Sequence, residues 1–299
     1  MATVATRMQD WETLSHCLVC DSEQIQAVDA PYNLCRCQAC GYVFDNPRPT
    51  LQALVSFYSK PGKYDSWLVA EAPRERLWGR RLRKLLKHVG RGNLLDVGTG
   101  TGQFLKVAKP YFTHVTGTEV SQSGLEIARE KYNLDVAQGE LEECNLPRES
   151  FDTITLFHVL EHVPDPTKTI ALCHNLLKMN GILLVCVPND VLAWTSKIKL
   201  LGKRLGLRPF QKFSPKIGVP RVFSSREIHL SHFTPTVLRR SLEQAGLKVL
   251  DESLDPYYSA TGIRLVLHSA YYAFHRLLFR LLHVNRYGTI WMVAQKSSS

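Results

Sequence analysis

Short apolar runs alternate with amphipathic segments along most of this chain. Runs typical of buried strands fall near 93–97, 114–118, 134–137, 151–157, 181–187, 247–251 and 288–294. Segments with apolar residues three and four apart, which is the spacing of helices, fall near 73–89, 101–109, 121–131, 166–178 and 234–245. This alternation predicts an α/β fold with a doubly wound parallel sheet, and the last apolar run predicts a final strand inserted into that sheet.

Two basic segments, 190–228 and 256–286, interrupt the alternation. Residues 191–226 carry nine Lys and Arg and no acid, and no Asp or Glu follows Asp255. These insertions carry most of the net charge of +10. They fit a lid over an anionic or lipid-linked substrate, a peripheral contact with an anionic membrane, an RNA-binding surface, or solvated helix faces. Nucleic acid is the less favoured partner, because aromatic–basic stacking motifs are not evident.

The first apolar run of the α/β region ends in a glycine-rich turn. Residues 94–104 read LLDVGTGTGQF, and the following predicted strand ends at Glu119. The spacing is G-x-G-x-G rather than the G-x-G-x-x-G of dinucleotide sites. Asp96, two residues before the first glycine, would repel a diphosphate but suits a cation. The pattern therefore predicts S-adenosylmethionine (SAM), with Glu119 accepting hydrogen bonds from both ribose hydroxyls.

The segment 94–104 resembles the first motif of class I SAM-dependent methyltransferases. Residues 151–163, 176–185 and 231–240 resemble later segments of the same family, in the same order. The resemblance implies the Rossmann-like sheet of these enzymes and a role as a SAM-dependent methyltransferase. It places SAM at Asp96, Gly98, Gly100, Gly102, Glu119, Val120, Glu140, Leu141 and His158, with Glu140 and Leu141 at the adenine.

Five cysteines lie in the first 40 residues. Four of them form two C-x-x-C knuckles, whose spacing is typical of a tetrahedral zinc site with Cys17, Cys20, Cys37 and Cys40 as ligands. Cys35, the fifth cysteine, is not among the predicted ligands. The segment resembles the zinc ribbon that precedes many bacterial class I methyltransferases of small molecules and sugars, so the zinc is expected to be structural. Residues 1–60 are predicted as the zinc-ribbon module and linker, and residues 61–299 as the methyltransferase domain.

Histidines near the predicted ends of the strands are the candidate bases. His158, His162 and His232 are predicted to be catalytic, because imidazole removes protons near neutral pH. His158, Glu161 and His162 also have the spacing that holds a divalent cation in ubiquinone-pathway and small-RNA methyltransferases, which this segment resembles. Those relatives have Glu where this chain has His158, so a divalent cation here is the less favoured prediction.

The function expected from these observations is SAM-dependent methyl transfer to a small molecule, such as a sugar, a lipid-linked saccharide or a natural-product intermediate. The alternatives are an RNA methyltransferase with a zinc ribbon and an inactive SAM-binding protein of the same fold. The chain has no apolar run long enough to span a bilayer, and its first residues lack the apolar core of a secretory signal. The expected location is cytoplasmic, in contact with a membrane surface if the basic insertions bind one.

Overall fold

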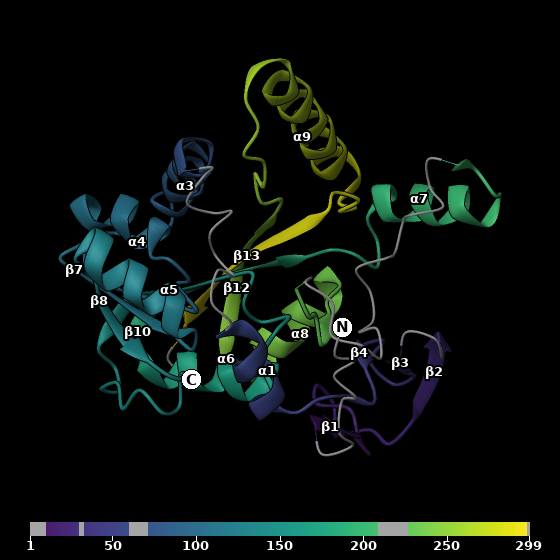
Figure 1. Cartoon of the computed structure of the whole chain (residues 1–299), viewed down its shortest axis with the longest axis horizontal. Helices are drawn as coiled ribbons and strands as arrows, with labels where there is room; N and C mark the ends of the chain where they lie inside the picture. Colours follow the sequence, from purple (N-terminus) through teal and green to yellow (C-terminus); the bar gives the residue numbers. More distant parts are fainter. Residues whose placement is uncertain (1–9, 30–32, 60–70, 209–226, 298–299) are drawn as a thin grey trace, which may run out of the picture.

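A seven-stranded sheet forms the centre of the computed structural model, which describes residues 10–29, 33–59, 71–208 and 227–297 (Figure 1). Its order is β12-β13-β10-β9-β6-β7-β8. The strands are β6 (Asn93–Val97), β7 (His114–Glu119), β8 (Asp135–Gln138), β9 (Phe151–Phe157), β10 (Leu177–Pro188), β12 (Leu247–Ser253) and β13 (Thr289–Lys296). Strands β6 to β10 are parallel, and β13 is antiparallel to both neighbours. The predicted α/β class and the insertion of the last strand are confirmed.

Helices cover both faces of this sheet, because successive side chains of each strand point to opposite faces. The helices are α3 (Glu71–Leu85), α4 (Gln103–Ala108), α5 (Gln122–Glu126) with a π-helical turn (Ile127–Lys131), α6 (Pro166–Leu176) and α8 (Pro235–Gln244), with a 3-10 turn at Lys109–Tyr111. One core joins Leu95 and Leu183 to α6 and α8, and the other joins Leu94 and Leu184 to α3 and α4. The α6 helix is shorter than predicted, because Leu177 pairs with Phe151 and begins β10.

The N-terminal segment folds as small strands followed by one helix. These elements are β1 (Trp11–Glu12), β2 (Ile25–Asp29), β3 (Leu34–Cys37), β4 (Val43–Asp45), β5 (Arg48–Pro49) and α1 (Leu51–Tyr58). A four-stranded sheet has the order β11-β4-β3-β2, in which β11 (Ser231–His232) comes from the downstream region. The predicted module 1–60 therefore shares a sheet with the predicted methyltransferase domain.

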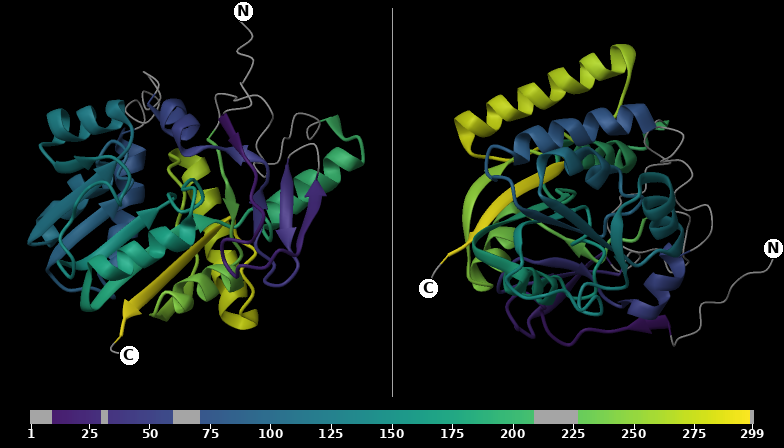
Figure 2. Two further views of the ribbon diagram at one scale, coloured as in Figure 1. Left: turned by 90° about the horizontal axis from the view of Figure 1, so that it is seen from below. Right: turned by 90° about the vertical axis from the view of Figure 1, so that its left-hand side faces the viewer.

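Each basic insertion contains one long helix at the periphery. These helices are α7 (Trp194–Arg204) and α9 (Gly262–Leu282), and residues 209–226 of the first insertion lie outside the described residues. Figure 2 shows α9 as an outer layer running over α3. The sequence of α9 is apolar over much of its length, yet its buried residue is His275. Among the described helices, none combines the length and the apolar character needed to span a bilayer.

Candidate functional site

Three glycines of the turn after β6 have positive φ, including Gly100 at 59°, and at the other two a Cβ would also collide with a neighbouring side chain. Gly98 has φ 64° and Gly102 has φ 76°, both in the left-handed region. A Cβ on Gly98 would lie 2.7 Å from Cγ2 of Val159, and one on Gly102 would lie 2.5 Å from Cδ1 of Leu134. At these two positions a larger residue would displace Val159 and Leu134, so only glycine lets the turn pack this closely against them.

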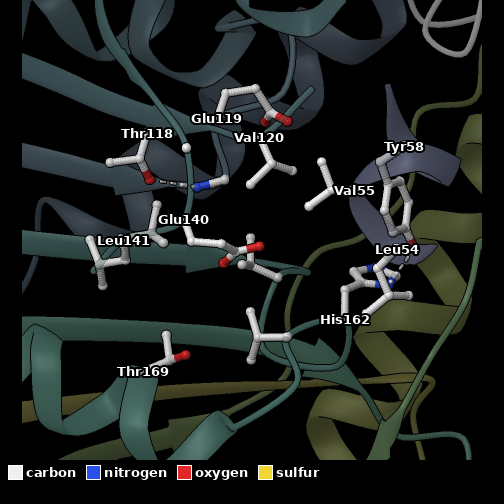
Figure 3. A pocket seen from close by; sticks show the side chains of 15 residues that line it. Leu54, Val55, Tyr58, Thr118, Glu119, Val120, Glu140, Leu141, His162 and Thr169 are labelled. Carbon is white, nitrogen blue, oxygen red and sulfur yellow. Dashed lines mark hydrogen bonds between the residues drawn. The ribbon is translucent and has the colours of Figure 1, made fainter. Parts of the chain in front are cut away.

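A pocket opens at the carboxyl ends of β6 and β7, beside this turn (Figure 3). Five residues predicted to bind SAM line it: Gly98, Glu119, Val120, Glu140 and Leu141. Four others do not line it: Asp96, Gly100, Gly102 and His158. The pocket nevertheless lies where open α/β sheets bind ligands, at the point where the strand order reverses about β6.

The acids predicted at the glycine turn are both buried. Glu119 accepts hydrogen bonds from the backbone N–H of Gly100 at 2.6 Å and of Ser121 at 2.8 Å. Asp96 lies beneath the turn and accepts a hydrogen bond from the hydroxyl of Thr155 at 2.6 Å. Burial raises the pKa of Glu119, and it raises the pKa of Asp96 to about 7. Cations or hydrogen-bond donors would stabilise the ionised forms of both carboxyls.

Glu140 stands on the wall of the pocket, in the loop after β8. Burial, and then the neighbouring carboxylates of Glu143 and Glu119, raise its pKa to about 7. With Glu119 it gives this end of the pocket two carboxyl groups, and no Lys or Arg is among the lining residues. Such an end suits a ligand that offers hydroxyl and amine donors and carries positive charge.

Helix α1 of the N-terminal segment closes the other side of the pocket. Leu54, Val55 and Tyr58 line it, and Figure 3 shows Tyr58 beside His162. The hydroxyl of Tyr58 lies 3.0 Å from Nδ1 of His162 and donates to the carbonyl of Ile228 at 3.1 Å. Sequence reasoning missed these residues, although Leu54 and Tyr58 are four residues apart and so share one face of a helix.

His162 is the predicted catalytic histidine that lines the pocket. Its Nδ1 lies against the carbonyl of Ile228, which fixes the tautomer with the proton on Nδ1. Its Nε2 lies 3.8 Å from Oε1 of Glu161, which is beyond hydrogen-bond distance. Burial lowers the pKa of His162, so the ring is neutral near pH 7 and its Nε2 lone pair can accept a proton.

His158 lies between two buried carboxylates instead of on the pocket wall. Its Nε2 is 3.5 Å from Asp255, and its Nδ1 is 3.3 Å from Glu161. Burial acts to lower the pKa of His158, but these carboxylates outweigh it and raise the pKa. The same contacts, acting against burial, lower the pKa of Glu161 to about 2. His158 is therefore suited to hold a positive charge rather than to remove a proton.

Arg81 completes this buried network, and sequence reasoning missed it together with Asp255. Nε of Arg81 donates to Oδ1 of Asp255 at 2.9 Å, and both side chains are buried completely or nearly so. Charges then alternate in sign from Arg81 through Asp255 and His158 to Glu161. The sequence does contain one signal, since Asp255 is the last acid of the chain.

The structure places His232, the third predicted catalytic histidine, between the N-terminal segment and the sheet domain. Its Nε2 lies 3.0 Å from Oδ1 of Asp45, and both side chains are buried. Beside this pair, the hydroxyls of Tyr42 and Ser231 are 2.5 Å apart. His232 does not line the pocket, so its surroundings favour a role in joining β4 to β11.

The donor atoms that could hold a cation near the pocket differ from the predicted set of His158, Glu161 and His162. Ligand atoms of Glu161, His162 and His229 lie within 4.8 Å of one another. Asp190, His229 and His232 form a second such set. His158 belongs to neither, because both its nitrogens face carboxylates. Glu161 and His162 thus group with His229, rather than with His158, as atoms that could hold a cation.

The four predicted zinc ligands come together in space. The Sγ atoms of Cys17, Cys20, Cys37 and Cys40 all lie within 4.8 Å of one another. Cys17 is 3.5 Å from Cys40, and Cys20 is 3.5 Å from Cys37. These distances are close to the edge of about 3.8 Å in a tetrahedron with Zn–S bonds of about 2.3 Å. Cys35 faces away and donates to the carbonyl of Asn46.

Comparison with known proteins identifies the family. The methyltransferase domain family matches residues 70–252, which is more than half of the chain. The chain belongs to this family. Residues 70–252 are thus a methyltransferase domain.

Curated relatives of this methyltransferase include enzymes named ubiquinone biosynthesis O-methyltransferase. The one from Pasteurella multocida is 34% identical over 143 residues, which is 40% of this chain and 58% of that enzyme. The one from Glaesserella parasuis serovar 5 is 30% identical over 165 residues, or 48% of this chain and 69% of that enzyme. The chain thus spans little more than half the length of the first of these relatives.

Solved structures support the methyltransferase fold. A SAM-dependent methyltransferase from Thermotoga maritima superimposes with a TM-score of 0.52 at 19% identity. The match covers 82% of this chain and 100% of that one. At this level of identity the likeness concerns the fold alone, and it confirms the Rossmann-like class that the sequence predicts.

Proposed function

We propose that this methyltransferase transfers the methyl group of SAM to a hydroxyl group of a small molecule. One observation carries the proposal: the pocket has carboxyl groups at one end and the neutral imidazole of His162 at the other. The carboxyl end accepts the hydroxyl and amine donors of SAM, and Nε2 of His162 accepts the proton of the acceptor. The names of the O-methyltransferase relatives also favour an oxygen acceptor.

The proposed reaction is a direct displacement. The acceptor oxygen bonds to the methyl carbon, the bond from that carbon to sulfur breaks, and S-adenosylhomocysteine leaves with the electron pair. The hydroxyl proton passes to Nε2 of His162, whose Nδ1–H is held by the carbonyl of Ile228. General base catalysis of this kind contributes about 10²–10⁴-fold to the rate.

Transfer of tritium from methyl-labelled SAM to small-molecule and lipid-linked saccharide acceptors tests the proposal. We expect His162→Asn to lower kcat by about 10²-fold or more while changing KM little, because the variant keeps a donor but loses the base. His16→Asn, on the exposed surface, is the matched control. An unchanged kcat in His162→Asn would contradict the role of His162. Label appearing in RNA instead would favour the RNA methyltransferase alternative, and binding of SAM without turnover would favour the inactive one.

A divalent cation that ionises the acceptor is the second candidate for this step. The carboxylate and two imidazoles of Glu161, His162 and His229 favour it, because they form a set that transition metals bind. A chelator followed by single metals separates the two candidates. Recovery of activity with Mn²⁺, under conditions in which Zn²⁺ alone does not restore it, would support the cation. Activity retained in the chelator at saturating SAM would support His162 acting alone.

We propose that the four clustered cysteines hold a structural zinc ion. The near-tetrahedral sulfur distances support it, and four thiolates leave no open position for a substrate. Elemental analysis of the purified protein should find one zinc per chain, and Cys20→Ser should lower that ratio, whereas Cys144→Ser, outside the cluster, should not. Because a tetrathiolate site needs reduced cysteines, the zinc also favours a cytoplasmic location.

We propose that the acceptor is anionic or lipid-linked. Both basic insertions start beside the site, since α7 follows Asp190 at the end of β10 and α9 follows Asp255. Tyr257, between Asp255 and α9, has its ring 4.8 Å from the ring of His158. A long acceptor that enters the pocket from this side would therefore lie along basic and apolar side chains.

A further inference from the structure

We propose that the outer face of α9 lies on the surface of an anionic phospholipid bilayer. Two properties of this helix favour such a bilayer: it has an exposed apolar stripe, and the flanks of that stripe carry no acidic residues. The inference goes beyond the proposed methyl transfer, and the two fail separately, because vesicle binding and SAM binding are different measurements.

The apolar stripe of α9 has helical spacing and faces away from the protein. Its members are at least half exposed, with Ile263 at 72% and Leu281 at 68%. They are Ile263, Val266, Leu267, Phe274, Leu277 and Leu281. Steps of three, four and seven residues place them within one sector of the helix. So many large exposed apolar side chains on one face mark a surface that another apolar medium covers.

The opposite face of α9 is the one that packs on the protein. Tyr272 donates to the carbonyl of Leu254, and its ring lies against the rings of Tyr258 and Tyr287. His275, the buried residue of the helix, lies against Trp194 at the start of α7. The outward direction of the apolar stripe is thus fixed by contacts on the inner face, and is not the result of a detached helix.

The charged residues of α9 favour an anionic lipid surface over other apolar partners. Arg264 follows Ile263 and Arg280 precedes Leu281, so each lies about 100° from the stripe, on opposite sides of it. Both are exposed, and α9 contains no Asp or Glu. Cations beside an apolar face suit the phosphates of an anionic lipid surface.

A second copy of the chain fits this face less well. Two copies related by a two-fold axis would bring the same basic flanks together, with no acid on either helix to neutralise them. RNA also fits less well, because the stripe is apolar and all its members except Phe274 are aliphatic. The length of α9, about 31 Å for its 21 residues, suits a helix that lies in the plane of the interface.

Helix α7 extends the surface. Ile198 and Leu201 are more than half exposed, and Lys197 and Lys199 are exposed beside them. Its first residue, Trp194, contacts His275 of α9, and its backbone N–H donates to the carbonyl of Arg286 in the segment after α9. Figure 1 shows both helices at the periphery of the molecule.

Flotation of the full-length protein with vesicles tests the surface. We compare phosphatidylcholine vesicles with vesicles that also contain phosphatidylglycerol. We expect binding to the anionic vesicles to be about tenfold tighter or more, and to weaken as salt is added, because exposed charges are screened. The variants are F274S/L277S/L281S for the stripe and R264E/R280E for the flanks, and each should lower anionic binding by about tenfold or more.

The control variant V28S/M179S removes two exposed apolar side chains elsewhere, and should bind vesicles like the wild type. All three variants alter exposed positions, so each should bind SAM normally in calorimetry. Equal binding to neutral and anionic vesicles, or none to either, would overturn the proposal. So would a dimer that only the stripe variant dissociates, or RNA binding that competes with the vesicles.

Discussion

At the scale of single residues, the site depends on carboxyl groups held in an unfavourable environment. Glu119 and Asp96 are buried and Glu140 is partly buried, and this burial raises the pKa of all three carboxyl groups. A binding site can keep such desolvated carboxyl groups when its ligand supplies hydrogen-bond donors or positive charge for them. Two predictions follow for the binding of SAM.

Glu119→Ala should weaken SAM binding by about 10–100-fold, because it removes an acceptor for the ribose hydroxyls worth about 1.5–3 kcal/mol. Isothermal titration calorimetry measures this change. Glu119→Gln keeps one acceptor oxygen, so it should lose less affinity for SAM than Glu119→Ala. Glu130→Gln, an exposed acid on the π-helical turn, is the matched control and should bind like the wild type. Unchanged affinity in Glu119→Ala would remove Glu119 from the site.

SAM affinity should rise between pH 5.5 and pH 7.5. The pKa of Glu140 is raised to about 7, so below that pH the carboxyl is largely protonated and accepts less well. Ionisation on raising the pH restores the acceptor, and the raised pKa of Glu119 acts in the same direction. The rise in melting temperature caused by SAM, measured across this range, reports the change. Glu140→Gln should flatten it, and a dependence that persists in this variant would exclude Glu140 as its source.

At the scale of secondary-structure elements, the join between β4 and β11 holds the N-terminal segment on the sheet domain. Asp45 and His232 form the buried pair at this join. Helix α1 follows the same segment and closes the pocket. A weakness at the join should therefore affect both stability and the pocket.

His232→Ala should lower the free energy of unfolding by about 3–5 kcal/mol, because it leaves the carboxyl of Asp45 buried without this partner. Urea denaturation measures the change. Glu243→Gln, which breaks the exposed pair of Arg239 and Glu243, should cost less than about 1 kcal/mol. Full stability in His232→Ala, with kcat reduced, would restore His232 as a catalytic residue.

At the scale of the whole molecule, the cysteine cluster is linked to the pocket through the small sheet. The cluster packs on that sheet, and the same segment continues into α1, which lines the pocket. Cys17 and Cys37 belong to the same buried core as Phe233 and Val237 of the sheet domain. Loss of metal from the cluster should loosen β3, β4 and α1 together, because zinc binding is coupled to folding in such modules.

Chelation of the metal should therefore increase hydrogen exchange in residues 33–59 and weaken SAM binding by several-fold, without unfolding the central sheet. Hydrogen-exchange mass spectrometry and calorimetry measure the two effects, and added zinc should reverse both. If the exchange of residues 33–59 increases while SAM binds as before, α1 does not close the pocket in the way proposed here.

The sequence by itself determined the elements of the sheet domain and the carboxyl groups at one end of the pocket. Periodicity located all seven strands of the sheet, since local apolar spacing reflects which faces are buried. Gly98 and Glu119 could be identified because a tight turn and the strand after it are close along the chain. The four cysteines could be grouped for the same reason.

Only the tertiary structure decided what the histidines do. His158, His162 and His232 are equivalent as sequence signals, but their surroundings come from Asp255, Tyr58 and Asp45. These partners are remote in the chain, and local spacing carries no information about them. The same holds for α9: its sequence shows an apolar and basic helix, whereas the packing of Tyr272 and His275 decides which side faces outward.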